Sequence, residues 1–227
     1  MKKKPQIVFS GYWPVSGNPK KSNRQDHIFH AQKKSMDFFL CGSGVNFSNA
    51  EKILIDELPS LPYIKNLESR ISSQDFVYLK FGQKIKSDAF FRLTSIWCSK
   101  ILFFDYLHNI NNADYYIWRD CVNNIRYDKI FSSNKKGVTC NKYCTHPLVK
   151  NPIPHKPFKG LLSYNFGPKK TGISASVIKI KSESIPEVVE KYKECLMYAD
   201  KNFEIFDEEI VLSYMFELYP KLFNFID

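Results

Sequence analysis

The chain has 227 residues, of which 44% are hydrophobic and 15% are aromatic. This composition is typical of a packed globular protein and excludes an intrinsically disordered chain. No apolar run approaches the roughly 20 residues that a bilayer-spanning helix needs. The apolar stretch Ile7–Phe9 is also far too short for the core of a signal peptide. We therefore expect a cytoplasmic protein, with peripheral contact at a membrane left open.

The formal net charge is +10, and the basic residues occur in short clusters spread along the sequence, such as Lys33–Lys34 and Lys135–Lys136. Nucleic acid, an anionic membrane surface or a phosphate-bearing substrate would each suit this charge. No pattern of a nucleic-acid-binding module accompanies the basic residues, so nucleic acid is the least expected of these partners.

The first predicted element is a strand over Gln6–Ser10, which Gly11 ends. Tyr12 and Trp13 then lead into a polar loop. A first strand that ends in a glycine turn suits a nucleotide-facing loop, in which Tyr12 or Trp13 stacks on a base. The alternative is that both rings pack against their own domain.

Four more elements are predicted before the middle of the chain: a helix over 27–34, a strand over 36–40, a helix over 49–57 and a strand over 75–81. The helix over 49–57 is predicted because Ser48 and Glu51 form a capping-box pattern.

A long helix is predicted over 89–108, because apolar residues recur at spacings of three and four. These residues are Phe90, Leu93, Trp97, Ile101 and Phe104. An apolar stripe of this kind indicates core packing.

The aromatic and β-branched run Tyr115–Trp118 predicts a buried strand that ends in Arg119 and Asp120. Ligands of open α/β sheets bind where the strands end, so Asp120 is a candidate residue of a metal or phosphate site. The alternative is that Asp120 caps the following turn.

Strands are predicted over 136–140 and 172–180, and a capping box at Ser184 and Glu187 begins a helix. That helix is expected to bury Val188, Tyr192, Cys195 and Leu196. A last helix begins at Asp207 and is expected to bury Ile210, Tyr214 and Leu218. Strands alternate with helices, which predicts a single α/β domain over 1–227 with a mostly parallel central sheet flanked by helices.

Two groups of acidic residues stand out: Asp120 after the central strand, and Asp207, Glu208 and Glu209 at the start of the last helix. Together they could supply a ligand for Mg²⁺ or Mn²⁺ and a general base. The alternative for the second group is structural, since Asp207 is a good helix N-cap and the two glutamates favour the positive end of the helix dipole.

In three segments the sequence resembles small GT-A type glycosyltransferases of bacterial or viral capsule and lipopolysaccharide synthesis. The segments are Phe9–Trp13, Ala113–Asp120 and Phe206–Ser213. The resemblance implies a Rossmann-like GT-A domain that moves a sugar from a nucleotide-sugar donor to a glycan or lipid-linked acceptor.

The resemblance also implies roles for individual residues. Asp120 would bind the metal, and one of Asp207, Glu208 and Glu209 would deprotonate the acceptor if the reaction inverts. The residues near the nucleotide sugar would be Gly11, Tyr12, Trp13, Lys84, Arg92, Trp118 and Arg119.

One departure from the family pattern concerns the metal. Trp118 stands two residues before Asp120, so a complete Asp-x-Asp motif is absent. Either Mn²⁺ or Mg²⁺ is shared with another group, such as His146 or His155, or the enzyme works without metal. In the second case basic side chains would offset the charge of the diphosphate.

A non-catalytic basic α/β protein that binds nucleic acid or an anionic surface is the alternative function. A nucleotide-dependent enzyme of another reaction type also stays open, because paired acids on an α/β sheet serve many chemistries.

Overall fold

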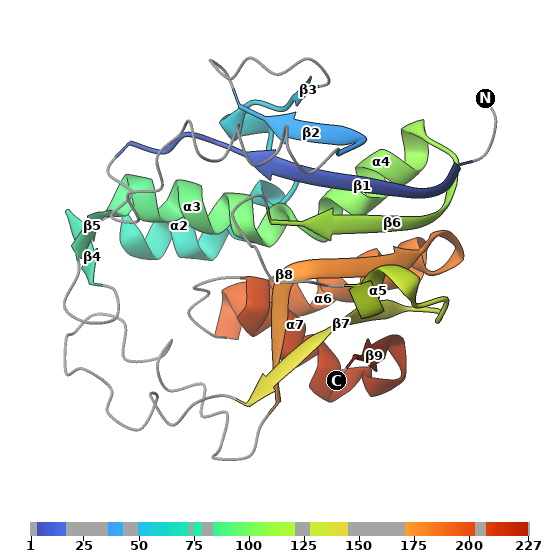
Figure 1. Cartoon of the computed structure of the whole chain (residues 1–227). Helices are drawn as coiled ribbons and strands as arrows, with labels where there is room; N and C mark the ends of the chain where they lie inside the picture. Colours follow the sequence, from blue (N-terminus) through green and yellow to red (C-terminus); the bar gives the residue numbers. More distant parts are fainter. Residues whose placement is uncertain are drawn as a thin grey trace.

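The computed structural model describes residues 4–16, 36–42, 50–72, 75–78, 84–120, 128–144, 171–202 and 208–226. These residues form one mixed α/β domain, in which a twisted sheet is flanked by helices (Figure 1). The extension of this domain over the whole of 1–227 stays a prediction.

The described residues build a seven-stranded sheet in the order β3-β2-β1-β6-β8-β7-β9. Neighbours β3, β2, β1 and β6 run parallel, as do β7 and β9, whereas β8 is antiparallel to both β6 and β7. The mostly parallel sheet is therefore confirmed. The strands are β1 (Lys4–Tyr12), β2 (Phe38–Cys41), β3 (Ala50–Lys52), β6 (Ala113–Arg119), β7 (Val138–Cys144), β8 (Thr171–Lys181) and β9 (Phe223–Phe225).

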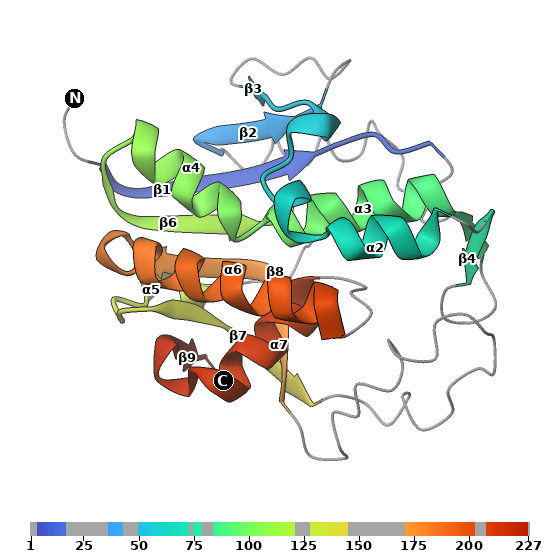
Figure 2. The same ribbon diagram turned by 180° about the vertical axis from the view of Figure 1, so that it is seen from behind.

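Helices cover the two faces of this sheet unequally, as Figure 2 shows. The helices are α2 (Lys65–Ile71), α3 (Ser87–Ser99), α4 (Leu102–Ile110), α5 (Asp128–Ser132), α6 (Ile185–Asn202) and α7 (Glu208–Leu218). Short 3₁₀ turns add η1 (Ile55–Glu57), η2 (Leu61–Tyr63), η5 (Ser182–Ser184) and η6 (Pro220–Leu222). A separate antiparallel pair joins β4 (Phe76–Tyr78) to β5 (Lys84–Lys86).

Side chains along β6 point alternately to the two faces of the sheet, and a hydrophobic cluster lies on each face. Trp118 points into the large core beneath α3, α4, α6 and α7, where Phe9 meets it edge-on at a ring-centroid distance of 5.5 Å. Ile117 points to the opposite face and packs with Ile130 of α5 and Val177 of β8. The larger core therefore lies on the face of the sheet to which Trp118 points.

Several sequence predictions are confirmed. The predicted strands 6–10, 36–40, 115–118 and 172–180 correspond to β1, β2, β6 and β8. The helix after Ser184 is α6, and Val188, Tyr192, Cys195 and Leu196 are buried as expected.

The predicted helix over 49–57 is wrong. Ala50–Lys52 is strand β3, paired in parallel with Phe39–Cys41, and only the short turn η1 follows it. Pairing with the edge of the sheet has overridden the local capping-box pattern.

The predicted helix over 89–108 is two helices with a tight turn between them. Ser95 and Ser99 donate their hydroxyls to the carbonyl oxygens four residues earlier, at 2.7 and 2.8 Å. Such bonds bend helices. The amide of Lys100 then bonds to the oxygen of Trp97 at 3.1 Å, three residues back, and α4 starts afresh at Leu102.

The predicted buried face of the last helix is also wrong. Val211, Leu212 and Met215 are buried in α7, whereas Leu218 is 50% exposed. The apolar residues of this helix surround most of its circumference, so their spacing alone does not choose the face that meets β8 and α6.

The helix predicted over 27–34 lies outside the described residues, as do Asp207, His146 and His155. Within the described ranges, no helix combines the length and apolar character that crossing a membrane requires.

Candidate active site

The parallel strands bring their carboxyl ends to one edge of the sheet. There β1 ends at Tyr12, β2 at Cys41 and β6 at Arg119 (Figure 1). Asp120 follows directly, and its backbone N–H donates to the carbonyl oxygen of Ser176 in β8 at 2.8 Å. This bond fixes the position of Asp120 between β6 and β8.

Asp120 and Glu208 meet at one buried lysine, Lys100, which lies in the turn between α3 and α4. The ammonium nitrogen of Lys100 is 3.1 Å from Oδ1 of Asp120 and 2.5 Å from Oε1 of Glu208. The side chains of Lys100 and Glu208 are only 9% and 5% exposed, whereas that of Asp120 is 29% exposed. Asp120 is therefore the member of this charged group that a ligand can reach.

The two carboxylates keep Lys100 charged. Burial lowers the pKa of the ammonium, but the attraction and hydrogen bonds of Asp120 and Glu208 more than offset this effect. The pKa of Lys100 is consequently raised above its ordinary value. The face of the Trp118 ring, with its centroid 5.4 Å from the ammonium nitrogen, adds a cation–π contact.

The two oxygens of Asp120 have different surroundings. Oδ1 accepts a hydrogen bond from Nε1 of Trp118 at 2.8 Å and is also the oxygen next to Lys100. Oδ2 makes no hydrogen bond or ion pair with the described residues. Asp120 is thus held through Oδ1, and Oδ2 can accept hydrogen bonds from a ligand.

Helix α7 is attached to β8 beside this group. Oε1 of Glu209 accepts from the amide of Ala175 at 3.0 Å, and Oγ of Ser213 accepts from the amide of Ile173 at 3.0 Å. The pairing of β8 with β7 shifts register nearby, which frees backbone amides from the ladder. Glu209 therefore ties α7 to the first half of β8, and this contact also positions the neighbouring Glu208.

Trp13, one of the predicted nucleotide contacts, is packed in the core. It is 4% exposed, stacks on Phe103 with ring centroids 5.3 Å apart, and donates through Nε1 to the oxygen of Ile53 at 2.9 Å. A Cβ at Gly11 would come within 2.5 Å of this ring, so Gly11 makes room for it. Burial gives no support to a direct Trp13–nucleotide contact, which stays a prediction.

Trp118 is likewise buried, and it acts on the site through its bond to Asp120. Phe103 stacks between Trp118 and Trp13, with its ring centroid 6.4 Å from that of Trp118. A row of aromatic rings therefore connects the end of β1 to Asp120.

Two of the predicted basic residues, Arg119 and Arg92, contact groups other than Asp120 and Glu208. Arg119 points to the opposite face of β6, where its guanidinium lies 5.7 Å from the Phe131 ring centroid. Arg92 is on the exposed side of α3 and pairs with Asp88 at 3.0 Å. The side chain of Lys84 lies outside the described residues.

Lys100 is the site residue that sequence reasoning missed. It stands three residues after Trp97 and four before Phe104, so helical spacing places its charge on the apolar face. A lysine on such a face needs a buried partner, and that requirement was the available signal.

The described residues do not fit a metal held at Asp120. They contain no group of three or more His, Cys, Asp and Glu residues that could hold an ion. Mg²⁺ prefers several oxygen ligands, whereas the Oδ1 atom of Asp120 already contacts an ammonium and an indole N–H. The divalent-metal cofactor stays a prediction that depends on groups outside the described ranges, such as His146 and His155.

No protein-family model and no curated protein matches the chain. Among solved structures, it is similar to the "crystal structure of a glycosyltransferase involved in the glycosylation of the major capsid of PBCV-1". The sequence identity is 10%, the match covers 98% of this chain and 81% of that chain, and the TM-score is 0.41. Similarity at this level is too low to assign an activity.

Proposed function

We propose that the chain is a glycosyltransferase that moves a sugar from a nucleotide-sugar donor to a glycan or lipid-linked acceptor in surface polysaccharide synthesis. The observation that supports this function is the meeting of Asp120 and Glu208 on Lys100 at the carboxyl ends of the parallel strands. Strand ends of α/β sheets are where nucleotide ligands bind. Both acids come from segments that resemble this class of enzyme.

In this proposal Asp120 binds the donor. Its carboxylate accepts hydrogen bonds from donor hydroxyls through Oδ2, while Trp118 and Lys100 hold Oδ1. Gly11 and Tyr12, at the end of the neighbouring strand β1, lie on the same edge of the sheet and contact the nucleotide. Lys100 holds Asp120 in place and offsets part of the negative charge that Asp120 and Glu208 would otherwise present to the diphosphate.

An acid at the start of α7 deprotonates the acceptor hydroxyl. Glu208 is the least suited of the three candidates, because it is buried and already paired with Lys100. Glu209 is half-buried and bonds to the amide of Ala175, and Asp207 lies outside the described residues. We therefore assign the base to Asp207 or Glu209, with Glu208 as the residue that positions Lys100.

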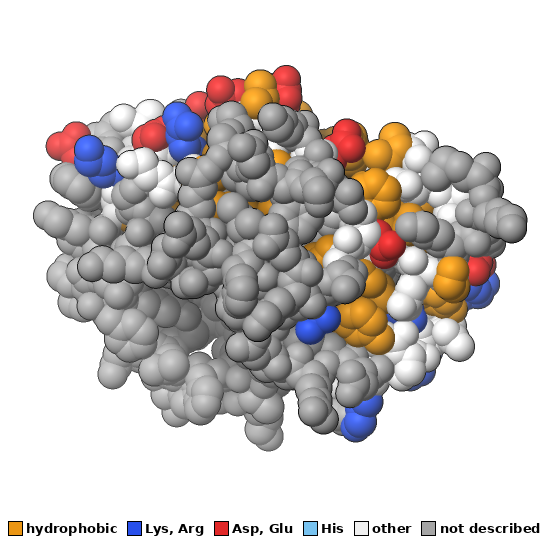
Figure 3. Space-filling view, turned by 45° about the horizontal axis from the view of Figure 1, so that its top comes forward, with side chains coloured by type: hydrophobic (Ala, Val, Ile, Leu, Met, Phe, Trp, Pro, Cys, Tyr) orange, Lys and Arg blue, Asp and Glu red, His pale blue; other side chains and the backbone are white. Residues whose placement is uncertain are grey.

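The location of the donor and the acceptor determines where in the cell the reaction takes place. We place it in the cytoplasm, at the surface of a membrane when the acceptor is lipid-linked. The described side chains on the face seen in Figure 3 include both basic and acidic groups. The net charge of +10 suits an anionic substrate such as a nucleotide sugar, and it also supports the alternative of a non-catalytic binding protein.

The test of the proposed function is the variant Asp120→Asn. Loss of one preorganised polar group in an active site typically costs 10²–10³-fold in rate, so we expect turnover of the donor to fall by roughly 100-fold or more. Release of nucleoside diphosphate from a panel of nucleotide sugars, with a mixed glycan acceptor, measures the effect.

The matched control is Asp56→Asn, which changes an exposed acid in η1 in the same way. This variant should retain activity, and both variants should keep the circular dichroism spectrum of the wild type. Near-normal turnover by a folded Asp120→Asn protein would overturn the assignment of Asp120.

A further inference from the structure

We propose that the ammonium of Lys100 is the resident cation of this site and takes the position that a divalent metal would occupy beside Asp120. The inference rests on the proposed function in treating the site as one that binds a diphosphate. The identity of the cation can nevertheless be tested with no substrate present.

The geometry places Lys100 as a bridging cation. Its nitrogen is within hydrogen-bond distance of Oδ1 of Asp120, directly after β6, and of Oε1 of Glu208 in α7, at 3.1 and 2.5 Å. Asp120 and Glu208 are the two acids whose oxygens lie beside this nitrogen. Because the ammonium lies between them, a metal bound to both would require Lys100 to leave.

Charge gives a second reason. The Lys100 side chain is 9% exposed, so water screens the positive charge of its ammonium weakly. A divalent ion on the Oδ1 side of Asp120 would lie beside this ammonium and be repelled by it. The indole N–H of Trp118 also donates to Oδ1 of Asp120, so this oxygen contacts two hydrogen-bond donors.

Helical structure fixes the position of Lys100. Its backbone lies in the turn between α3 and α4, in helical conformation, and its amide bonds to Trp97. The Trp118 ring lies against its ammonium. The positive charge is therefore built into the fold, and its presence does not depend on the metal concentration in solution.

The test uses Mn²⁺ alone as the probe and thermal unfolding as the readout. A cation that binds only the native state raises its melting temperature. We expect Mn²⁺ to change the melting temperature of the wild type and of Asp120→Asn equally, because no ion binds at Asp120. We expect Lys100→Ala to gain a Mn²⁺-dependent increase, which the double variant Lys100→Ala with Asp120→Asn lacks.

Two results would overturn the inference: a Mn²⁺-dependent increase in the wild type that Asp120→Asn lacks, or a folded Lys100→Ala protein that gains no increase. Lys65→Ala, which removes an exposed lysine from α2, controls for the loss of a positive charge. If Lys100→Ala does not fold, the comparison of the wild type with Asp120→Asn decides alone.

The result is separable from the proposed function. A protein that transfers no sugar but shows the expected Mn²⁺ behaviour would contradict only the proposed function. A protein that transfers sugar and loses that activity when chelator removes an ion bound at Asp120 would contradict only the inference about Lys100.

Discussion

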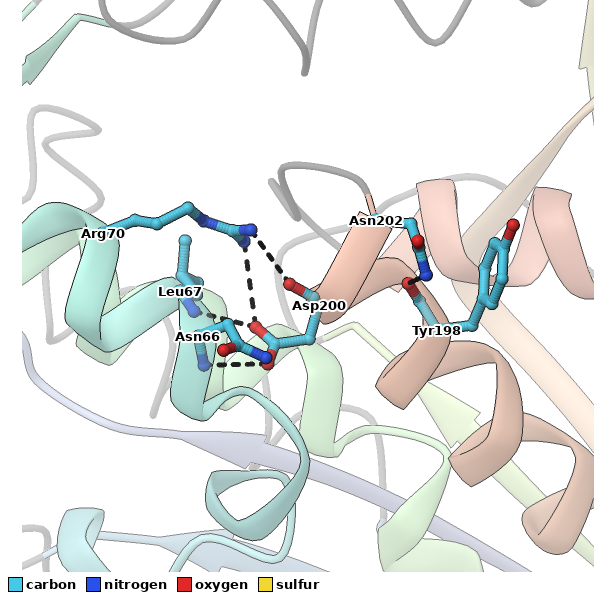
Figure 4. Close-up of polar contacts among 6 residues, drawn as sticks. All are labelled: Asn66, Leu67, Arg70, Tyr198, Asp200 and Asn202. Carbon is cyan, nitrogen blue, oxygen red and sulfur yellow. Dashed lines mark hydrogen bonds and ion pairs between the residues drawn. The ribbon is translucent and has the colours of Figure 1, made fainter.

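The carboxylate of Asp200, a residue of α6, caps the N-terminus of a different helix, α2 (Figure 4). It projects from α6, and its two oxygens accept from the amides of Asn66 and Leu67 at the start of α2, each at 2.8 Å. The residue before α2, Ile64, offers no capping side chain. Asp200 is 3% exposed and the amide of Leu67 is buried, so water does not replace this carboxylate at Leu67.

We expect Asp200→Ala to lower the free energy of unfolding by about 2 kcal/mol or more, since it removes a helix cap and leaves the buried amide of Leu67 unpaired. Urea unfolding followed by circular dichroism measures the difference. Asn202→Ala is the control, because it removes the exposed bond from Asn202 to the oxygen of Tyr198 on the same helix. The control should lose less than roughly 0.5 kcal/mol. Equal losses would show that Asp200 is not a tertiary cap.

Among single residues, the sequence identifies candidate acidic residues more readily than the residues that they contact in the folded protein. Asp120 and Glu208 were visible because a carboxylate after a buried strand and an acid at a helix start are local patterns. Lys100 was not recognised, because its role depends on two segments remote in sequence that meet only in the folded chain. Asp200 was missed for the same reason.

Among the elements, the turn before β7 depends on Gly137. Its φ of +76° is in the left-handed region, which side chains rarely adopt, and an added Cβ would collide with the carbonyl oxygen of Leu222. The amide of Gly137 donates to Oγ of Ser184 at 2.9 Å. Glycine therefore allows η6 and β9 to pack closely against the start of β7.

We expect Gly137→Ala to destabilise the protein by roughly 1–3 kcal/mol, through backbone strain and the collision with Leu222. Protection of the β9 amides against hydrogen exchange should fall more than protection in β1 and β6, because β9 pairs with β7 right after this turn. Lys135→Ala, an exposed change two residues earlier, should leave both quantities unchanged. Undiminished stability of Gly137→Ala would refute the role of this glycine.

The elements that the sequence predicted well are those with a strong local pattern. The β-branched and aromatic runs of β1, β6 and β8 and the amphipathic face of α6 agree with the structure. The predictions failed where tertiary contacts decide. Ala50–Lys52 forms a strand because it pairs with the edge of β2. In α7, Val211 and Met215 are buried because β8 and α6 pack against that face of the helix.

At the scale of the whole molecule, the order of the strands in the sheet determines where the candidate site lies. Four parallel neighbours, β3, β2, β1 and β6, direct their carboxyl ends to one edge, and antiparallel β8 brings its own beginning and the start of α7 to the same place. The alternation of strands and helices predicted the sheet, but it could not predict that two acidic segments meet on one lysine.

The most direct test of a nucleotide-sugar site at Asp120 is thermal unfolding against a panel of nucleoside diphosphates and nucleotide sugars, with Asp120→Asn beside the wild type. We expect one nucleotide class, at about 100 times its dissociation constant, to raise the melting temperature of the wild type by roughly 5 °C or more. Asp120→Asn should respond far less. No increase with any nucleotide, together with an increase on adding a short oligonucleotide, would contradict the proposed function and favour a basic binding protein.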